Sequence, residues 1–223
     1  MSDDIFDLVQ AGDIAAVETL IATEPGAIRA RNEQGLSPIQ MAFFRGLHAV
    51  VDVLLAAGPE LDAFEAAIVG DAGQLAARLD DDPELLVAYS PDGWTLLHLA
   101  PWAGQPETTR LLLARGADLA AVSTNALRNQ PLNAAVAGPN AETRTACVRL
   151  LLEAGADANN RQEGGNTPSH TSAHLGDIES VETLLAHGAD MGLRSDDGKS
   201  AADYAREGGH EELAAELEAG CVR

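Results

Sequence analysis

Residues 92–118 read DGWTLLHLAPWAGQPETTRLLLARGAD, and this stretch decides the fold. Thr95 stands before an apolar run, in the manner of an N-cap whose side-chain oxygen accepts from first-turn N–H groups. Gly104 and Gly116 each follow an apolar segment of helical spacing, and glycine is favoured where a helix ends in the left-handed conformation. The stretch therefore predicts two short helices joined at Gly104.

Similar blocks recur along the chain and make this stretch one unit of a repeat. The blocks SPIQMA, QPLNAA, TPSHTSA and SAADYA start at Ser37, Gln130, Thr167 and Ser200. In addition, DIFDLVQAGDIAAVETLI from Asp4 lies 58 residues before DAFEAAIVGDAGQLAARL. The sequence thus predicts seven units, the first and third degenerate, at about residues 4–36, 37–61, 62–94, 95–129, 130–166, 167–199 and 200–219.

The composition favours an all-α repeat solenoid. Aromatic residues make up only 4% of the chain, so alanine and leucine must fill the interior. One pair of short helices cannot bury its own apolar face, and neighbouring units must therefore stack.

The sequence resembles the ankyrin-repeat family. The family pattern, roughly DxxGxTPLHxAAxxGH followed by LLxxGADxN, is visible in DGWTLLHLAPWAG, in GNTPSHTSAHLGD and in three GAD blocks. The resemblance extends from about residue 4 to residue 219 and implies a curved stack of antiparallel helix pairs with short β-hairpin fingers. It further implies a non-enzymatic protein-interaction scaffold.

Several departures from the pattern stand out. No room for a finger exists between Gly58 and Asp62. Pro101 occupies a helix-interior position, where we expect it to kink or end the helix early. The unit after it has about five extra residues around 139–145, and the finger at 120–129 is about two residues longer than its successors. Added function and drift in a tolerant loop both remain open for these two segments.

The charge restricts the possible partners. The formal net charge is −21, a balance that repels nucleic acid phosphates and anionic lipid. We therefore expect no nucleic acid or membrane partner; the acidic surface would attract a basic protein or serve solubility alone. The two cysteines match no metal-ligand spacing, and the acidic N-terminus has no signal-peptide pattern, so a cytoplasmic location is expected.

Three histidines are candidates for chemistry. His98 and His170 occupy the histidine position of the repeat, where the resemblance implies a structural hydrogen bond to neighbouring backbone. His170 and His174 are four residues apart, a spacing that could hold zinc on one helix face, although no third ligand is evident. No phosphate-binding or nucleophile motif is present, and no cofactor is expected.

In the family, partners are held by finger tips and by the residues just before the helix-joining glycine. Tryptophan, phenylalanine and arginine at such positions favour a binding hot spot. The alternative is that Trp102 only fills space beside Pro101. The predicted binding positions are Leu36, Phe44, Arg45, Ile68, Val69, Trp94, Trp102, Ala103, His174 and Leu175.

Three functions follow as hypotheses. The first is a general scaffold that binds another protein through its concave face and finger tips. The second is a dedicated inhibitor or immunity-type partner of a basic enzyme. The third is a zinc-binding or catalytic role around the histidines. Self-association through the same apolar strip also stays open.

Overall fold

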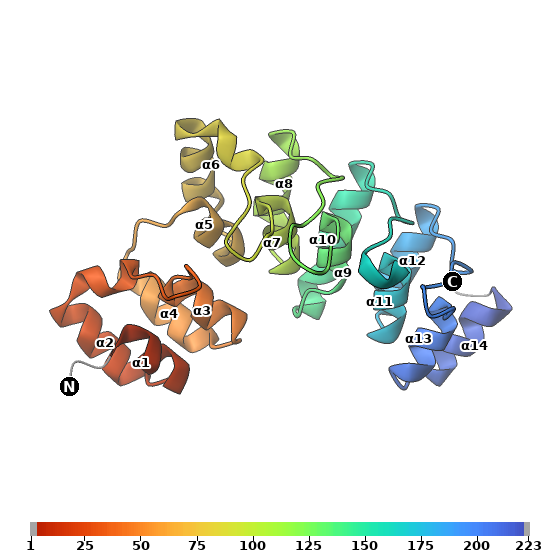
Figure 1. Ribbon diagram of the computed structural model, residues 1–223, viewed down its shortest axis with the longest axis horizontal. Helices are drawn as coiled ribbons and strands as arrows, with labels where there is room; N and C mark the ends of the chain where they lie inside the picture. The colour runs from red at the N-terminus through yellow and green to blue at the C-terminus, as the bar shows by residue number, and fades with distance from the viewer. Residues whose placement is uncertain (1–3, 221–223) are drawn as a thin grey trace.

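The structure is a computed structural model that describes residues 4–220. It is an arch of fourteen described α-helices in seven consecutive pairs (Figure 1). In the middle of the arch, the first helix of each pair lies on the hollow side and the second on the outer side (Figure 1). The pairs are α1 Ile5–Ala11 with α2 Ile14–Thr23, α3 Pro38–Phe44 with α4 His48–Ala56, α5 Ala63–Val69 with α6 Ala72–Asp81, α7 Leu96–Trp102 with α8 Pro106–Ala114, α9 Pro131–Val136 with α10 Ala141–Glu153, α11 Pro168–His174 with α12 Ile178–Ala186, and α13 Ala201–Glu207 with α14 Glu211–Ala219.

The seven pairs confirm the predicted all-α architecture of stacked helix pairs. Each pair falls inside one of the seven sequence units, while the unit boundaries themselves stay a prediction. No helix among residues 4–220 is long and apolar enough to cross a membrane.

The first helices begin where the sequence places their caps. Ser37 and Ser200 each accept a hydrogen bond from the backbone N–H three residues on. That residue's side chain in turn accepts from the cap's own N–H, which completes a capping box. Thr95 and Thr167 cap α7 and α11 in the same way, with a histidine at the third position of the helix.

The fingers are turns and not paired strands, since residues 4–220 contain no assigned strand. Backbone hydrogen bonds close the turns, for example from Ser90 N to Trp94 O and from Ser195 N to Lys199 O. Short 3₁₀ helices lie near three of them, at Pro25–Arg29, Pro83–Leu86 and Glu163–Gly165. Between α4 and α5 only residues 57–62 connect the pairs, which confirms that this junction has no finger.

Two local expectations need correction. Pro101 does not end its helix early, because α7 has seven residues, as do α3, α5, α11 and α13. Pro101 stands next to the last residue of α7, so its missing N–H removes a bond only from the final turn. Most of the extra residues around 139–145 do not form a loop but lengthen α10 to thirteen residues.

The main core extends from Ile5 to Ala189 between the two helix layers, and the buried residues of α11, α13 and α14 form a separate cluster. The largest fully buried side chains of the main core are aliphatic and include Leu54, Leu96, Leu112 and Leu151. One phenylalanine-rich and tryptophan-rich cluster lies apart from this core, at the junction of the second, third and fourth pairs.

Candidate protein-binding surface

Four aromatic side chains from α3, α7 and the turn before α7 form what we call the aromatic cluster: Phe43, Phe44, Trp94 and Trp102. The ring centroids of Phe44 and Trp102 are 5.6 Å apart, and those of Trp94 and Trp102 are also 5.6 Å apart. Phe43 lies 6.2 Å from Trp102. Such separations are typical of favourable edge-to-face or tilted aromatic pairs. All four side chains are partly exposed.

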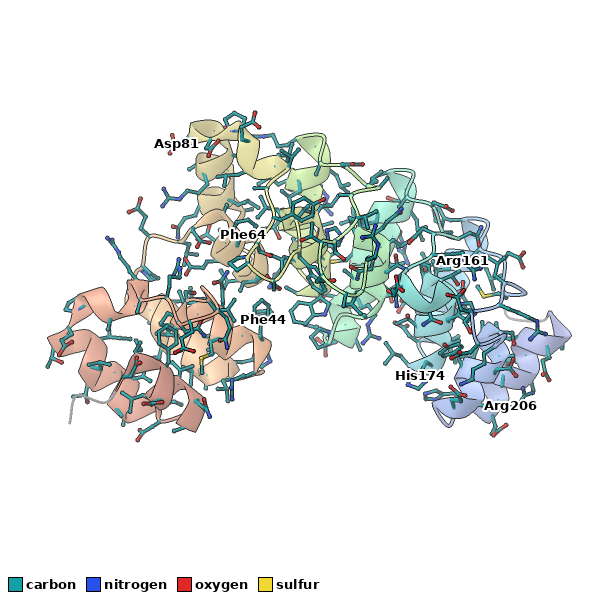
Figure 2. All side chains as sticks on the ribbon, in the orientation of Figure 1. Phe44, Phe64, Asp81, Arg161, His174 and Arg206 are labelled. Atoms are coloured by element: carbon teal, nitrogen blue, oxygen red, sulfur yellow. The ribbon has the colours of Figure 1, made fainter. Side chains whose placement is uncertain are left out.

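The cluster bridges two pairs that are not neighbours in the stack. Phe43 and Phe44 end α3, and Trp102 ends α7, while α5 lies between these helices. The end of α5 offers only the aliphatic side chains of Ile68 and Val69, which pack under and beside the rings. Figure 2 places Phe44 at the edge of α3 that faces the rest of the array.

The predicted positions divide into three groups. Phe44, Trp94 and Trp102 meet in the cluster, and Val69 packs against it. Ile68 and Ala103 are its buried floor, at 0% and 5% exposure, so they offer a partner no contact surface. We remove these two from the proposed surface.

The remaining predicted positions lie outside the cluster. Leu36, on the finger before α3, is partly buried, and Arg45 is exposed directly after Phe44. His174 and Leu175 are exposed at the end of α11, far along the arch from Phe44 (Figure 2). The ring centroids of His174 and Tyr204 are 6.4 Å apart.

Sequence reasoning missed Phe43, which joins the cluster through Trp102 and Phe44. It also left open whether Trp102 only fills space beside Pro101. Trp102 instead packs on rings from α3, and it keeps part of its surface exposed. The doubled aromatic at 43–44 is a signal that could have suggested a cluster larger than two tryptophans.

His98 is a buried structural element, as predicted. Its Nδ1 accepts from Thr95 N at 3.3 Å, and its Nε2 lies 3.0 Å from the backbone oxygen of Asn129 in the next finger. A carbonyl can only accept, so Nε2 carries the proton and the ring is neutral. Burial lowers the pKa of His98, and this opposes protonation further.

His170 repeats the arrangement two junctions later, between the sixth and seventh pairs. Its Nδ1 accepts from Thr167 N at 3.0 Å, and its Nε2 lies 3.1 Å from Lys199 O. Burial again lowers its pKa. Each of these histidines therefore joins the cap of one pair to the finger of the next.

No metal or nucleophile arrangement accompanies these rings in the described part of the chain. Residues 4–220 contain no group of three or more histidine, cysteine, aspartate or glutamate side chains that could hold a metal ion. Burial raises the pKa of the Cys147 thiol to about 11, which leaves it protonated at neutral pH.

The surface charge is mostly unpaired acid. Of the 35 acidic residues in the chain, only twelve in the described range lie within 4.0 Å of a cation. Among the lysine and arginine residues between 4 and 220, Arg45 and Arg128 alone make no ion pair. Arg45 thus places an unneutralised positive charge directly after the aromatic Phe44.

Comparison with known proteins gives one family and several relatives. The family model for ankyrin repeats (3 copies) matches residues 5–123, 65–162 and 132–221. A transient receptor potential cation channel subfamily A member 1 homolog of Caenorhabditis elegans is 35% identical over 149 residues, which is 67% of this chain and 12% of that protein. The human ARF GTPase-activating protein GIT2 is 44% identical over 90 residues, 40% of this chain and 11% of that protein.

A B-cell lymphoma 3 protein homolog of Mus musculus is 38% identical over 104 residues, 47% of this chain and 22% of that protein. The chain therefore spans less than a quarter of each of these three relatives.

Proposed function

The chain belongs to the ankyrin-repeat family, and from this membership we propose that it is a non-enzymatic scaffold that binds another protein through the hollow side of its arch. Stacked repeats of this kind create extended concave surfaces that are used for binding. The observation that carries the proposal is the aromatic cluster, which gathers the only two tryptophans of the chain and two of its four phenylalanines.

The aromatic cluster has the properties of a hot spot. Its rings are held by mutual contacts and by buried Ile68 and Leu99. Binding of a partner would therefore cost little side-chain entropy in this chain. Partly exposed aromatic surface next to an arginine is the composition that dominates binding energy in protein interfaces. We propose a surface formed by the cluster together with Leu36, Arg45 and Val69, extended along the arch by His174 and Leu175.

The acidic surface supports a partner with a basic face, in a cytoplasmic setting. Unpaired carboxylates steer a positively charged protein toward the array and speed association, an effect that salt weakens. Arg45 is a local positive charge on this acidic surface, and it would pair with an acidic side chain of the partner.

Affinity capture from native lysate tests the surface. The Trp94→Ala/Trp102→Ala variant should lose the captured proteins, whereas Ile178→Ala, on the outer helix α12, should keep them. Ile178 is a suitable control because it is apolar and 49% exposed. Full capture by the double tryptophan variant, with an unchanged melting curve, would remove the cluster from the proposal.

A second variant avoids the packed rings. Arg45→Glu changes only an exposed, unpaired charge and should leave the melting temperature unchanged. Weaker capture would indicate an acidic group of the partner at this point, and stronger capture a basic one. Equal capture would remove Arg45 from the surface. Several recovered proteins would favour a general scaffold, and one salt-sensitive target a dedicated inhibitor.

A further inference from the structure

The junction between α4 and α5 contains a pocket of about 470 Å³, and no predicted binding position lines it. Its apolar walls come from Ile28 and Ile39 on one side and from Ala63, Phe64 and Leu85 on the other. This volume lies within the range of about 300–1,000 Å³ that is usual for ligand sites. The pocket is separate from the aromatic cluster, although Phe64, which lines the pocket, packs against the same buried residues as the cluster.

Three of the other junctions show what can fill this space. After α8, α10 and α12 the chain runs through segments that we call approach segments, residues 117–121, 156–160 and 189–193, before it forms the finger. Each inserts small or aliphatic side chains at alternate positions against the core: Ala117 and Leu119, Ala156 and Ala158, Ala189 and Met191.

The junction between α4 and α5 lacks such a segment. Residues 57–62 form the shortest connection between any two pairs of the described chain, and in this link Leu61 alone is buried, at 1% exposure. The pocket wall includes Ile28, which precedes the finger before it, and Leu85, which precedes the finger after it. The pocket therefore lies where an approach segment is missing.

The finger tips on the two sides of the link lie against each other. A Cβ placed on Gly35 would lie only 3.3 Å from Pro91 Cγ, so the finger before α3 contacts the finger before α7 directly. No finger residue lines the pocket, which is bordered by the charged side chains Arg29, Arg31, Arg78, Glu60, Asp62 and Glu65. These charges balance one another, unlike the strongly acidic remainder of the surface.

The polar groups of the junction also differ from those at a finger-bearing junction. Gln40 stands at the position of His98 and His170, and its Oε1 accepts from Ser37 N at 2.9 Å. The backbone oxygen that would correspond to that of Asn129 belongs to Leu61, and it accepts from Arg78 Nε instead. Gln40 itself does not line the pocket, and its amide nitrogen lacks an acceptor in the described residues, as does Asn133 Nδ2 at a finger-bearing junction.

We propose that this pocket binds an extended segment of a partner protein that carries small or aliphatic side chains at alternate positions. Such a segment takes the place of the missing approach segment, against Ile28, Ile39 and Phe64. Arg29, whose only carboxylate contact is at 3.9 Å, is available to an acidic residue of the segment.

The chain itself supplies the probe. An acetylated and amidated peptide of residues 188–193, GADMGL, should shift the methyl NMR signals of Ile28 and Ile39 in the full chain. The signals of Ile14 and Ile178, exposed isoleucines elsewhere, serve as the internal reference. A peptide with Met191→Asp and Leu193→Asp should leave all four signals in place.

Two changes to the protein complete the test. Leu85→Ser should weaken the peptide severalfold, while Leu86→Ser, its partly buried neighbour outside the pocket, should not. Insertion of residues 189–193 after Gly58 should fill the pocket in cis and abolish the shifts without lowering the melting temperature.

Three results would overturn the proposal: no shift at millimolar peptide, equal shifts with the aspartate peptide, or equal weakening by Leu86→Ser. If the same signals move when the protein alone is concentrated, a second copy occupies the pocket and the assignment to a partner is wrong. The aromatic cluster is untouched by these variants, so failure here leaves the concave surface to its own test.

Discussion

Two junctions of the array are held by different interactions. The first is the junction between α4 and α5, which joins the second pair to the third, and the second is the junction that joins the fourth pair to the fifth. At the second, the buried ring of His98 bonds the cap residue Thr95 on one side and the finger carbonyl of Asn129 on the other. At the first, Arg29 pairs with Glu60 in the link, and Arg31 pairs with Asp62 at the end of the link and with Glu65 in α5. The first junction therefore depends on exposed charge and the second on buried neutral groups.

One repeat position shows how the change arises. Arg161, six residues before the cap Thr167, donates to Arg194 O in the next finger at 2.7 Å. Arg31 stands six residues before Ser37, but no next finger exists, and it reaches Asp62 at 2.8 Å and Glu65 at 3.4 Å instead. The deletion of a finger thus converts a bond to backbone into ion pairs.

The largest expected effect comes from the buried histidine. His98→Ala removes the ring that bonds both sides of its junction and leaves Asn129 O and Thr95 N without their partner. We expect a loss of about 3 kcal/mol in the free energy of unfolding, from the unmet buried groups and the cavity.

Urea unfolding followed by circular dichroism measures this loss. His98→Asn is the matched control, because Asn133 occupies the same position in the next pair and accepts from Gln130 N. If His98→Ala lost less free energy of unfolding than His98→Asn, the hydrogen bonds of the ring would contribute little to this junction.

The second effect concerns the ion pairs. Arg31→Met leaves the carboxylate of Glu65, whose side chain is 6% exposed, without its cation. We expect a loss of about 2 kcal/mol, against about 0.5 kcal/mol for Arg161→Met, whose carboxylate partner Asp196 is exposed. Equal losses would mean that the two arginines contribute equally to the free energy of unfolding and that the missing finger does not change the contribution of Arg31.

Salt should separate the two junctions further. Screening weakens exposed ion pairs, so the wild-type chain should lose stability at high ionic strength in the segment before the link. The Arg31→Met variant should show less of this dependence. Hydrogen exchange, which resolves α1–α4 from the later helices, measures it.

The third effect is the pH dependence of the histidine junctions. Burial lowers the pKa of His98 and His170 in the folded state below the unfolded value of about 6.5. The unfolded chain therefore binds more protons below that pH, and stability falls as the pH drops from 7 toward 5.5. For each histidine that stays neutral in the folded chain, the loss can reach at most about 1.4 kcal/mol per pH unit below 6.5.

His170→Gln isolates this contribution, because glutamine occupies the same position at Gln40 and does not titrate. Its stability should fall less than that of the wild type between pH 7 and 5.5. Parallel pH profiles would mean that His170 keeps an ordinary pKa when folded. The lowered pKa values of Glu60 and Asp203 act only at more acidic pH, where their stabilisation is lost as they protonate.

Much of this comparison could be predicted from the sequence, because repeat patterns are local. The caps at Ser37 and Thr95, the role of His98 and the absence of a finger after Gly58 all follow from residues within one unit or its neighbour. The burial of Ala103 does not, because Arg45, at the corresponding position of the second pair, is exposed.

The contact of Phe43 with Trp102 could not be predicted either. These residues are two pairs apart, and they meet over the small aliphatic end of α5, at the junction that lost its finger. The pattern within a unit contains no information on such a contact. The same holds for the pocket beside Phe64, since its walls come from three different pairs of the array.

The smallest expected effect is the sharpest test of the difference between the junctions. Gln40→His places at the finger-less junction the side chain that joins the others. Its Nδ1 can still accept from Ser37 N, so the cap of α3 is preserved. Its Nε2 has no finger carbonyl to meet, because the Leu61 carbonyl already accepts from Arg78. The free energy of unfolding should therefore stay within about 0.5 kcal/mol of the wild type. A stabilisation of more than 1 kcal/mol, on the order of a full hydrogen bond, would contradict this expectation. It would mean that a histidine at this position can stabilise a junction without a finger carbonyl. Insertion of residues 189–193 after Gly58 in the same variant would then separate the two explanations, since only a restored segment can supply a new carbonyl.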